Sequence, residues 1–137
     1  VGNPADNILD GGDGADSLTG GAGGDGFVIA RNTSGPEPDR ITDFEAGIDL
    51  IMLDLASFGI DPIALKLTSS GSLGPDSFVK GVGARALDPD DHFLFDTAAQ
   101  SLWLDRDGSG TQQPVRVAYL NGPDLSQLAA SDFYLVV

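Results

Sequence analysis

The sequence predicts an all-β protein, and two observations support this fold class. Residues 2–28 repeat with a period of nine, and each repeat ends in a short stretch that carries a large apolar residue. Beyond residue 28, short apolar runs alternate with Gly, Pro, Asp and Asn, which is the pattern of brief strands separated by turns. The 137 residues fit a single domain, with repeats at 1–28 and a β-rich C-terminal cap at 29–137.

The repeats form three consecutive blocks that start at Gly2, Gly11 and Gly20. The second and third blocks match G-G-x-G-x-D-x-U-x without a mismatch, where U is a large apolar residue. A flexible Gly-rich linker, the alternative, would show neither this register nor an apolar residue at every ninth position. The first block departs from the pattern at three positions, where it carries Asn3, Ala5 and Asn7.

Each block is expected to turn over its first six residues and to extend over its last three. Two blocks then make one coil of 18 residues, so the first and third blocks stack on the same side, about 4.8 Å apart. The apolar eighth positions, Leu9, Leu18 and Phe27, point inward and begin a narrow core. The predicted architecture is therefore a short parallel β-roll of nonapeptide repeats, followed by an antiparallel β-rich cap.

The strands expected after the repeats are short, rich in β-branched or aromatic residues, and bounded by turn residues. One short helix is expected at 124–130, and a hairpin turn at 105–110. In chain order the expected strands are 27–29, 41–44, 50–53, 63–67, 77–80, 93–95, 102–104, 115–120 and 133–137.

Acidity is the strongest feature of the composition. Seven Lys and Arg face 21 acidic residues, for a net charge of −14, and 19 of the acids are Asp. A merely solubilising surface would use Glu equally well, whereas short Asp side chains suit turns and hard cations. The charge argues against nucleic acid or an anionic membrane surface as a partner, and no apolar run is long enough to span a membrane. Because Cys is absent, disulfides and thiolate zinc sites are excluded.

Stacked turns of this composition predict calcium sites. Stacking brings two loops of backbone carbonyls and two Asp or Asn side chains together, and these oxygens repel one another without a cation. Ca²⁺ accepts about six to eight oxygen ligands in flexible geometry, whereas Mg²⁺ keeps its water and demands stricter geometry. We therefore expect Ca²⁺ as the bound ion.

The two complete nonapeptides resemble those of the RTX family, in particular the C-terminal modules of serralysin-type proteases and other type I-secreted proteins. Residues 39–53, DRITDFEAGIDLIML, are similar to that family's D-x-I-x-D-F-x-x-G-x-D-x-I-x-L segment. Residues 91–96, 102–110 and 132–137 resemble the terminal β-cap of such proteins. The resemblance covers most of the chain and is strongest up to about residue 55.

The resemblance implies that each ion lies between two repeats on the same side of the roll. The ligands implied for a first ion are Asn3, Ala5 and Asn7 with Gly20, Ala22 and Asp25. A second site would use Gly12, Gly14 and Asp16 and would face residues 29–34, where no repeat survives. A third would use Gly21, Gly23 and Asp25 with Asp39 or Asp43. We expect one to three ions, with the first site weakened because Asn7 replaces an Asp.

The resemblance also implies a calcium-dependent folding and secretion module of an extracellular protein. Such a chain stays unfolded in the low-calcium cytosol, leaves through the type I secretion apparatus and folds outside. Residues 132–137 resemble a terminal secretion signal, and upstream repeats and a passenger domain are expected. The alternative is a polysaccharide-binding or adhesive module similar to the R-modules of bacterial epimerases, but the seven Lys and Arg are too scattered to suggest a basic groove.

Other motifs carry less weight, and we expect no enzymatic activity because no catalytic signature is recognisable. Residues 105–110 resemble the first half of an EF-hand loop, but the twelfth position is Arg116, so a hairpin turn is preferred to an extra ion. His92, the single histidine, is expected at the surface or in the cap. Trp103 and Tyr134 lie in apolar runs, which favours core packing over stacking on a sugar.

Overall fold

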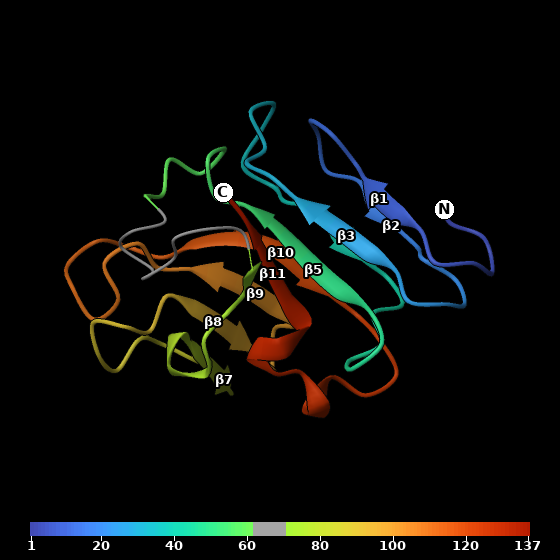
Figure 1. Cartoon of the computed structure of the whole chain (residues 1–137). Coiled ribbons are helices and arrows are strands. Elements are labelled where there is room, and N and C mark those ends of the chain that lie inside the picture. The colour runs from blue at the N-terminus through green and yellow to red at the C-terminus, as the bar shows by residue number, and fades with distance from the viewer. Residues whose placement is uncertain (62–70) are drawn as a thin grey trace.

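The computed structural model describes residues 1–61 and 71–137, and this part of the chain is mostly β (Figure 1). Its strands form two mixed sheets. The first sheet has the order β1 (Ile8–Asp10), β3 (Gly26–Ile29), β5 (Leu50–Asp54), β11 (Phe133–Val136) and β6 (Gly71–Ser72). The second has the order β2 (Ser17–Leu18), β4 (Arg40–Ile41), β10 (Val115–Leu120), β9 (Ser101–Leu104), β8 (Phe93–Asp96) and β7 (Phe78–Gly81). Three short 3₁₀ turns are η2 (Pro75–Ser77), η3 (Leu125–Gln127) and η4 (Ala130–Asp132).

The first five strands alternate between the two sheets, so the chain winds in coils. β1, β3 and β5 pair in parallel in one sheet, and β2 and β4 pair in parallel in the other. Leu9 lies opposite Phe27, which confirms that the first and third blocks are neighbours. The next pairs, Leu18 with Ile41 and Phe27 with Ile51, span more residues because the turn after β3 is longer than the turns of the repeats.

One hydrophobic cluster joins the repeats to the C-terminal half of the chain. Leu9, Leu18 and Phe27 are buried in it, as their eighth positions in the repeats predict. The ring of Phe27 lies 6.2 Å from that of Phe44, and Phe133, near the other end of the chain, is also fully buried. The coils therefore share their core with the last strands instead of forming an independent unit.

The prediction of an antiparallel cap is wrong for much of the C-terminal half. β11 pairs in parallel with β5, and β10 pairs in parallel with β4, so these late strands extend both sheets of the coils. β7 and β8 are also parallel, whereas β8, β9 and β10 form an antiparallel meander. The parallel pairing with β5 places Phe133 beside Ile51, and burial of both side chains favours this register.

Several local elements differ from expectation. The helix expected at 124–130 is replaced by η3 and η4, because Asp124 and Asp132 accept hydrogen bonds from the nearby backbone amides of Ser126 and Ala129. β9 and β10 are antiparallel neighbours, but residues 105–114 connect them instead of a tight turn. β6 is an additional strand, and the strand expected at 63–67 lies outside the described residues. In the part of the chain that the structure describes, no helix has the length and apolar character needed to cross a membrane.

Candidate metal centre

Side chains at the ends of the turns connect successive coils. Ahead of the first-sheet strands, Asp25 Oδ1 accepts a hydrogen bond from the backbone N–H of Asn7 (2.8 Å), and Asp49 Oδ1 accepts one from Asp25 (2.9 Å). Ahead of the second-sheet strands, Asp39 Oδ1 accepts one from Asp16 (2.8 Å). In each pair the later carboxylate reaches back to the earlier coil. Oδ1 of each carboxylate is thus held by the backbone of the earlier coil.

The turns require glycine for two separate reasons. Gly21 and Gly23 have φ angles of +102° and +109°, in the left-handed region that disfavours residues with a Cβ. Gly20 lies outside that region, but an atom at its Cβ position would be only 2.3 Å from Oδ2 of Asp25. The first position of this repeat is therefore glycine because the sixth-position carboxylate lies against it.

Two carboxylate oxygens inside these turns are buried without a hydrogen-bond partner. They are Oδ2 of Asp16 and Oδ2 of Asp25, and Asp25 as a whole is only 1% exposed. Burying an ionised carboxylate oxygen is costly unless a donor or a cation compensates for the lost water. The two oxygens are therefore the atoms that a bound cation would satisfy.

Like charges gather around the same turns. Burial raises the pKa of the Asp39 carboxyl above its ordinary value of 3.8, and the charges of Asp16 and Asp10 raise it further against the effect of a backbone hydrogen bond. Burial also raises the pKa of Asp49, with added contributions from Asp25 and Asp43. A divalent cation among these carboxylates would remove their mutual repulsion.

The six residues implied for a first ion lie in two stacked turns. An atom at the Cβ position of Gly21 would be 3.2 Å from the carbonyl oxygen of Asn3, and one at Gly23 would be 2.9 Å from the carbonyl carbon of Ala5. The remaining implied ligands are Asn7 in the first turn and Gly20, Ala22 and Asp25 in the third block. The structure therefore brings this set together.

The first turn differs in shape from the complete repeats. Asn3 and Ala5 do not adopt the left-handed conformation that Gly21 and Gly23 have at the same repeat positions. Asn7 Oδ1 is already engaged within its own turn, where it accepts a hydrogen bond from the backbone N–H of Asn3 (2.7 Å). The first block therefore supplies the weaker half of the site, which agrees with its departures from the pattern.

The second site faces an irregular segment that takes the place of a repeat. The backbone N–H of Gly14 donates to Asn32 Oδ1 (3.2 Å). Asp13 Oδ1 accepts hydrogen bonds from the backbone N–H and the hydroxyl of Thr33 (3.1 and 2.7 Å). Like Gly14, Gly12 has a positive φ, so the turn keeps the shape of a complete repeat. The stretch after β3 therefore stacks on the second block although its sequence shows no repeat.

Two carboxylates converge at this second site. An atom at the Cβ position of Gly11 would lie 2.8 Å from Oδ2 of Asp39 and 3.0 Å from Oδ2 of Asp16. Oδ2 of Asp16 is one of the two buried oxygens without a partner. The second site, whose partner segment carries no repeat motif, is thus the one at which two carboxylate oxygens meet.

At the implied third site, Asp43 and Asp49 both bind the turn that carries Asp25. Asp39, the other carboxylate implied there, lies beside the second site, where its Oδ1 accepts a hydrogen bond from the backbone N–H of Asp16. Asp49 instead takes the position next to Asp25, and its Oδ2 accepts a hydrogen bond from the N–H of Glu45 (2.8 Å). The spacing could have revealed this residue, because Asp49 stands two positions before the buried Ile51 as Asp25 stands before Phe27.

Asp43 lies at the third site but binds the backbone. Its two carboxylate oxygens accept hydrogen bonds from the N–H groups of Gly20 and Gly21, both at 2.9 Å. It thereby clamps the turn of the third block to the next coil. Its assignment to this site agrees with its position, and its role there includes holding the turn in place.

In the described residues, the side chains that commonly bind metals do not gather in one cluster. Within residues 1–61 and 71–137, no group of three or more His, Cys, Asp or Glu side chains forms a metal-binding cluster. A calcium site built mainly from backbone carbonyls does not require one. His92 is buried instead of lying at the surface, and its Nδ1 is 2.8 Å from the carbonyl oxygen of Asp105.

The chain matches no protein-family model, and no curated protein is significantly similar to it. The resemblance to the RTX family therefore depends on the nonapeptides, on residues 39–53 and on the looser likeness of the C-terminal segments.

Mild acidification is expected to stabilise the metal-free protein. The folded-state pKa values of Asp39 and Asp49 lie above 3.8, so the folded chain binds protons more tightly than the unfolded chain. Their contribution to stability is fully present below pH 3.8 and is lost as the pH rises through the raised values. In metal-free buffer, the fraction of folded chain should rise as the pH falls from 7 to about 4.5, which circular dichroism measures as a growing β signal.

Saturating Ca²⁺ should abolish or reverse this trend, because the ion and the protons compete for the same oxygens. Asp13, Asp96 and Asp107 have lowered pKa values, so they oppose the effect only near and below their ordinary value of 3.8. A metal-free β signal that falls steadily between pH 7 and about 4.5 would contradict the predicted repulsion.

Proposed function

We propose that this chain is a calcium-binding module whose coils fold around Ca²⁺. The observation that carries the proposal is the pair of buried carboxylate oxygens, one on Asp16 and one on Asp25, that have no hydrogen-bond partner between stacked turns. Around them stand turns whose glycines leave the backbone accessible and whose carboxylates repel one another. No catalytic step is assigned to the chain.

The donor set favours calcium over other ions. The carboxylates of Asp39 and Asp49 bond to the backbone of Asp16 and Asp25, and the chain has no Cys to attract zinc. His92 stands on β8's N-terminal side and bonds to the backbone of Asp105, outside these turns. Ca²⁺ accepts many oxygen ligands at variable distances, which suits two turns that contribute mainly carbonyls.

The proposal includes a short parallel β-roll formed by the first five strands. Its support is the alternation of these strands between the two sheets and their parallel pairing. Further support comes from the hydrogen bonds that Asp25, Asp39 and Asp49 make to the preceding coil. Ions between the turns would complete the connection that these side chains begin.

We also propose a role in type I secretion and in folding of an upstream passenger, because folding of the chain would depend on calcium. A net charge of −14 disfavours compaction of the calcium-free chain, and Ca²⁺ outside the cell would drive folding by mass action. The segment that resembles a secretion signal includes β11, which lies between β5 and β6 in the first sheet. The secretion apparatus could therefore read it only before folding, which orders export ahead of calcium binding.

The test is a calcium titration of the purified chain, followed by circular dichroism and calorimetry. Excess chelator should abolish most of the β signal, and Ca²⁺ should restore it cooperatively with measurable heat of binding. Mg²⁺ at the same concentrations should restore little structure. A chain that is fully folded in chelator and takes up no Ca²⁺ would refute the proposal.

A further inference from the structure

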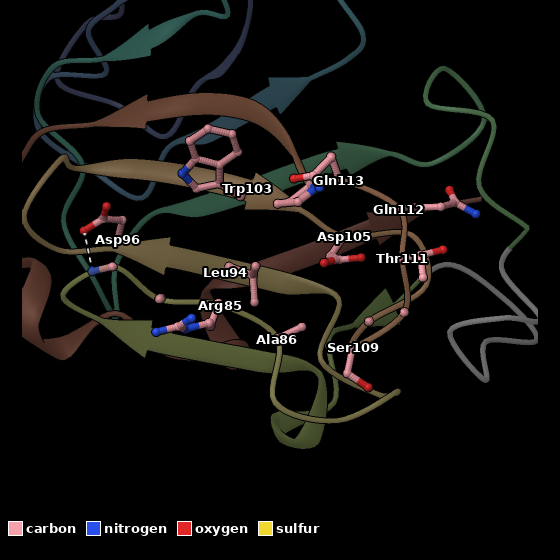
Figure 2. Close-up of a pocket in the computed structure, with 15 residues that line it drawn as sticks. Arg85, Ala86, Leu94, Asp96, Trp103, Asp105, Ser109, Thr111, Gln112 and Gln113 are labelled. Carbon is pink, nitrogen blue, oxygen red and sulfur yellow. Dashed lines mark hydrogen bonds between the residues drawn. The ribbon is translucent and has the colours of Figure 1, made fainter.

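A groove lies on the outer face of the second sheet, away from the calcium turns. Leu94 of β8 and Trp103 of β9 are direct cross-strand neighbours and form its floor (Figure 2). Residues 83–86 form one wall and residues 108–114 the other, and they enclose about 470 Å³. This volume is within the usual range for small-molecule sites.

The walls are held by specific hydrogen bonds. Asp96 accepts one from the N–H of Gly83 (3.0 Å), and Asp107 accepts one from Gln112 (3.0 Å). The N–H of Ser109 donates to the carbonyl of Asp88 (3.0 Å), which ties the second wall to the segment after the first. Hydrogen bonds therefore hold both walls of the groove in place.

Trp103 is a partly exposed platform, so the expectation that it packs in the core is wrong. The guanidinium of Arg116, its cross-strand neighbour, lies 4.7 Å from the centre of the indole ring. Trp103 lines the groove but Arg116 does not. The part of the indole that Arg116 does not cover is therefore accessible from the groove. Leu94, which is 1% exposed, and Arg116 are the cross-strand neighbours of Trp103 on its two sides.

Three polar side chains that line the groove are free to bind a ligand. Among the described residues, no hydrogen bond or ion pair engages the guanidinium of Arg85 or the side-chain amides of Gln112 and Gln113. Carboxylates of Asp96 and Asp105 also line the groove. Planar hydrogen-bond donors and acceptors thus surround one aromatic surface. The two carboxylates, Asp96 and Asp105, outnumber the single guanidinium of Arg85.

We propose that this groove binds a neutral saccharide. The C–H face of a sugar ring is apolar and packs on an indole, while its hydroxyl groups donate to carboxylates and accept from guanidinium and amide groups. The excess of acid in the groove, in a chain of net charge −14, disfavours an acidic polymer. The groove uses none of the calcium-turn residues, so the proposal is independent of the calcium proposal.

The single tryptophan makes the test direct, because the intrinsic indole fluorescence of the chain comes from Trp103 alone. The calcium-saturated chain is titrated with cellobiose, maltose and lactose, with alginate oligosaccharides and tetramethylammonium as competing ligand classes. At least one neutral disaccharide should give a saturable change, which calorimetry confirms. Arg85→Ala and Gln113→Ala should each weaken binding by roughly fivefold.

Arg31→Ala is the matched control, because Arg31 is exposed and lies outside the groove, and it should bind as the unaltered chain does. The calcium midpoints of all three variants should be unchanged. The proposal is overturned if no neutral disaccharide binds, if alginate or tetramethylammonium binds as tightly, or if neither groove variant weakens binding.

Discussion

Asp25→Ala is expected to raise the Ca²⁺ concentration at the folding midpoint by at least about tenfold, or about 1.4 kcal/mol. Asp25 is almost fully buried, and its Oδ2 has no partner in the protein. It stands between the turn of Asn7 and that of Asp49 and therefore belongs to two candidate sites. No other carboxylate in the turns combines these properties.

The variant also loses the hydrogen bond from Asn7 to Asp25 Oδ1, so a second substitution must separate structure from ion binding. Asp25→Asn keeps the size and one acceptor oxygen but removes the charge. It should raise the midpoint nearly as far as alanine does. Asp16→Ala should give a smaller shift, because Asp16 belongs to one candidate site.

Asp76→Ala is the matched control, since Asp76 is an exposed Asp in η2, far along the chain from the turns. Its midpoint should stay within about twofold of the unaltered chain. If Asp25→Asn folds at the original Ca²⁺ concentration, or if Asp76→Ala shifts the midpoint equally, the buried oxygen is not a calcium ligand.

Gly122→Ala is expected to destabilise the calcium-saturated protein by about 2–4 kcal/mol. An atom at the Cβ position of Gly122 would lie 1.9 Å from the carbonyl oxygen of Phe44 and 3.2 Å from its nitrogen. Phe44 is fully buried, and its N–H donates to the carbonyl of Asn121 (2.8 Å), so neither backbone can move away easily. This contact joins the last coil to the end of β10.

Thermal unfolding in saturating Ca²⁺ measures the effect, which should lower Tm by roughly 10 °C. Gly35→Ala is the control, because no atom lies within 4 Å of its Cβ position and its φ is not in the left-handed region. It should melt like the unaltered chain. A Gly122→Ala protein with an unchanged Tm would show that the backbone around Gly122 and Phe44 can shift to admit the methyl group without cost.

The nine-residue repeat was sufficient to predict the local structure of the coils. It predicted the pairing of Leu9 with Phe27 and the burial of Leu18. It also placed Asp16 and Asp25 in turns, where both have a buried oxygen without a partner. Prediction succeeded here because the period, the turn glycines and the apolar position act within one or two coils.

Prediction failed where the chain leaves the period. Asp39 or Asp43 was expected beside Asp25. Asp43 does bind that turn, but the long turn after β3 brings Asp39 to Asp16, and Asp49 is the carboxylate bonded to Asp25. Turn length decides this pairing, and residues 29–38 carry no repeat from which to count. Trp103 was placed in the core because its strand is apolar, yet alternation along β9 directs it to the outer face.

The sequence alone thus determined that short strands alternate with glycine-rich turns and that carboxylates gather at those turns, because both depend on residues close together in the chain. Only the tertiary structure decided that β10 and β11 continue the two sheets of the coils, and which carboxylates meet. Those choices depend on burying apolar faces such as Phe133 against Ile51, which lie far apart in the sequence.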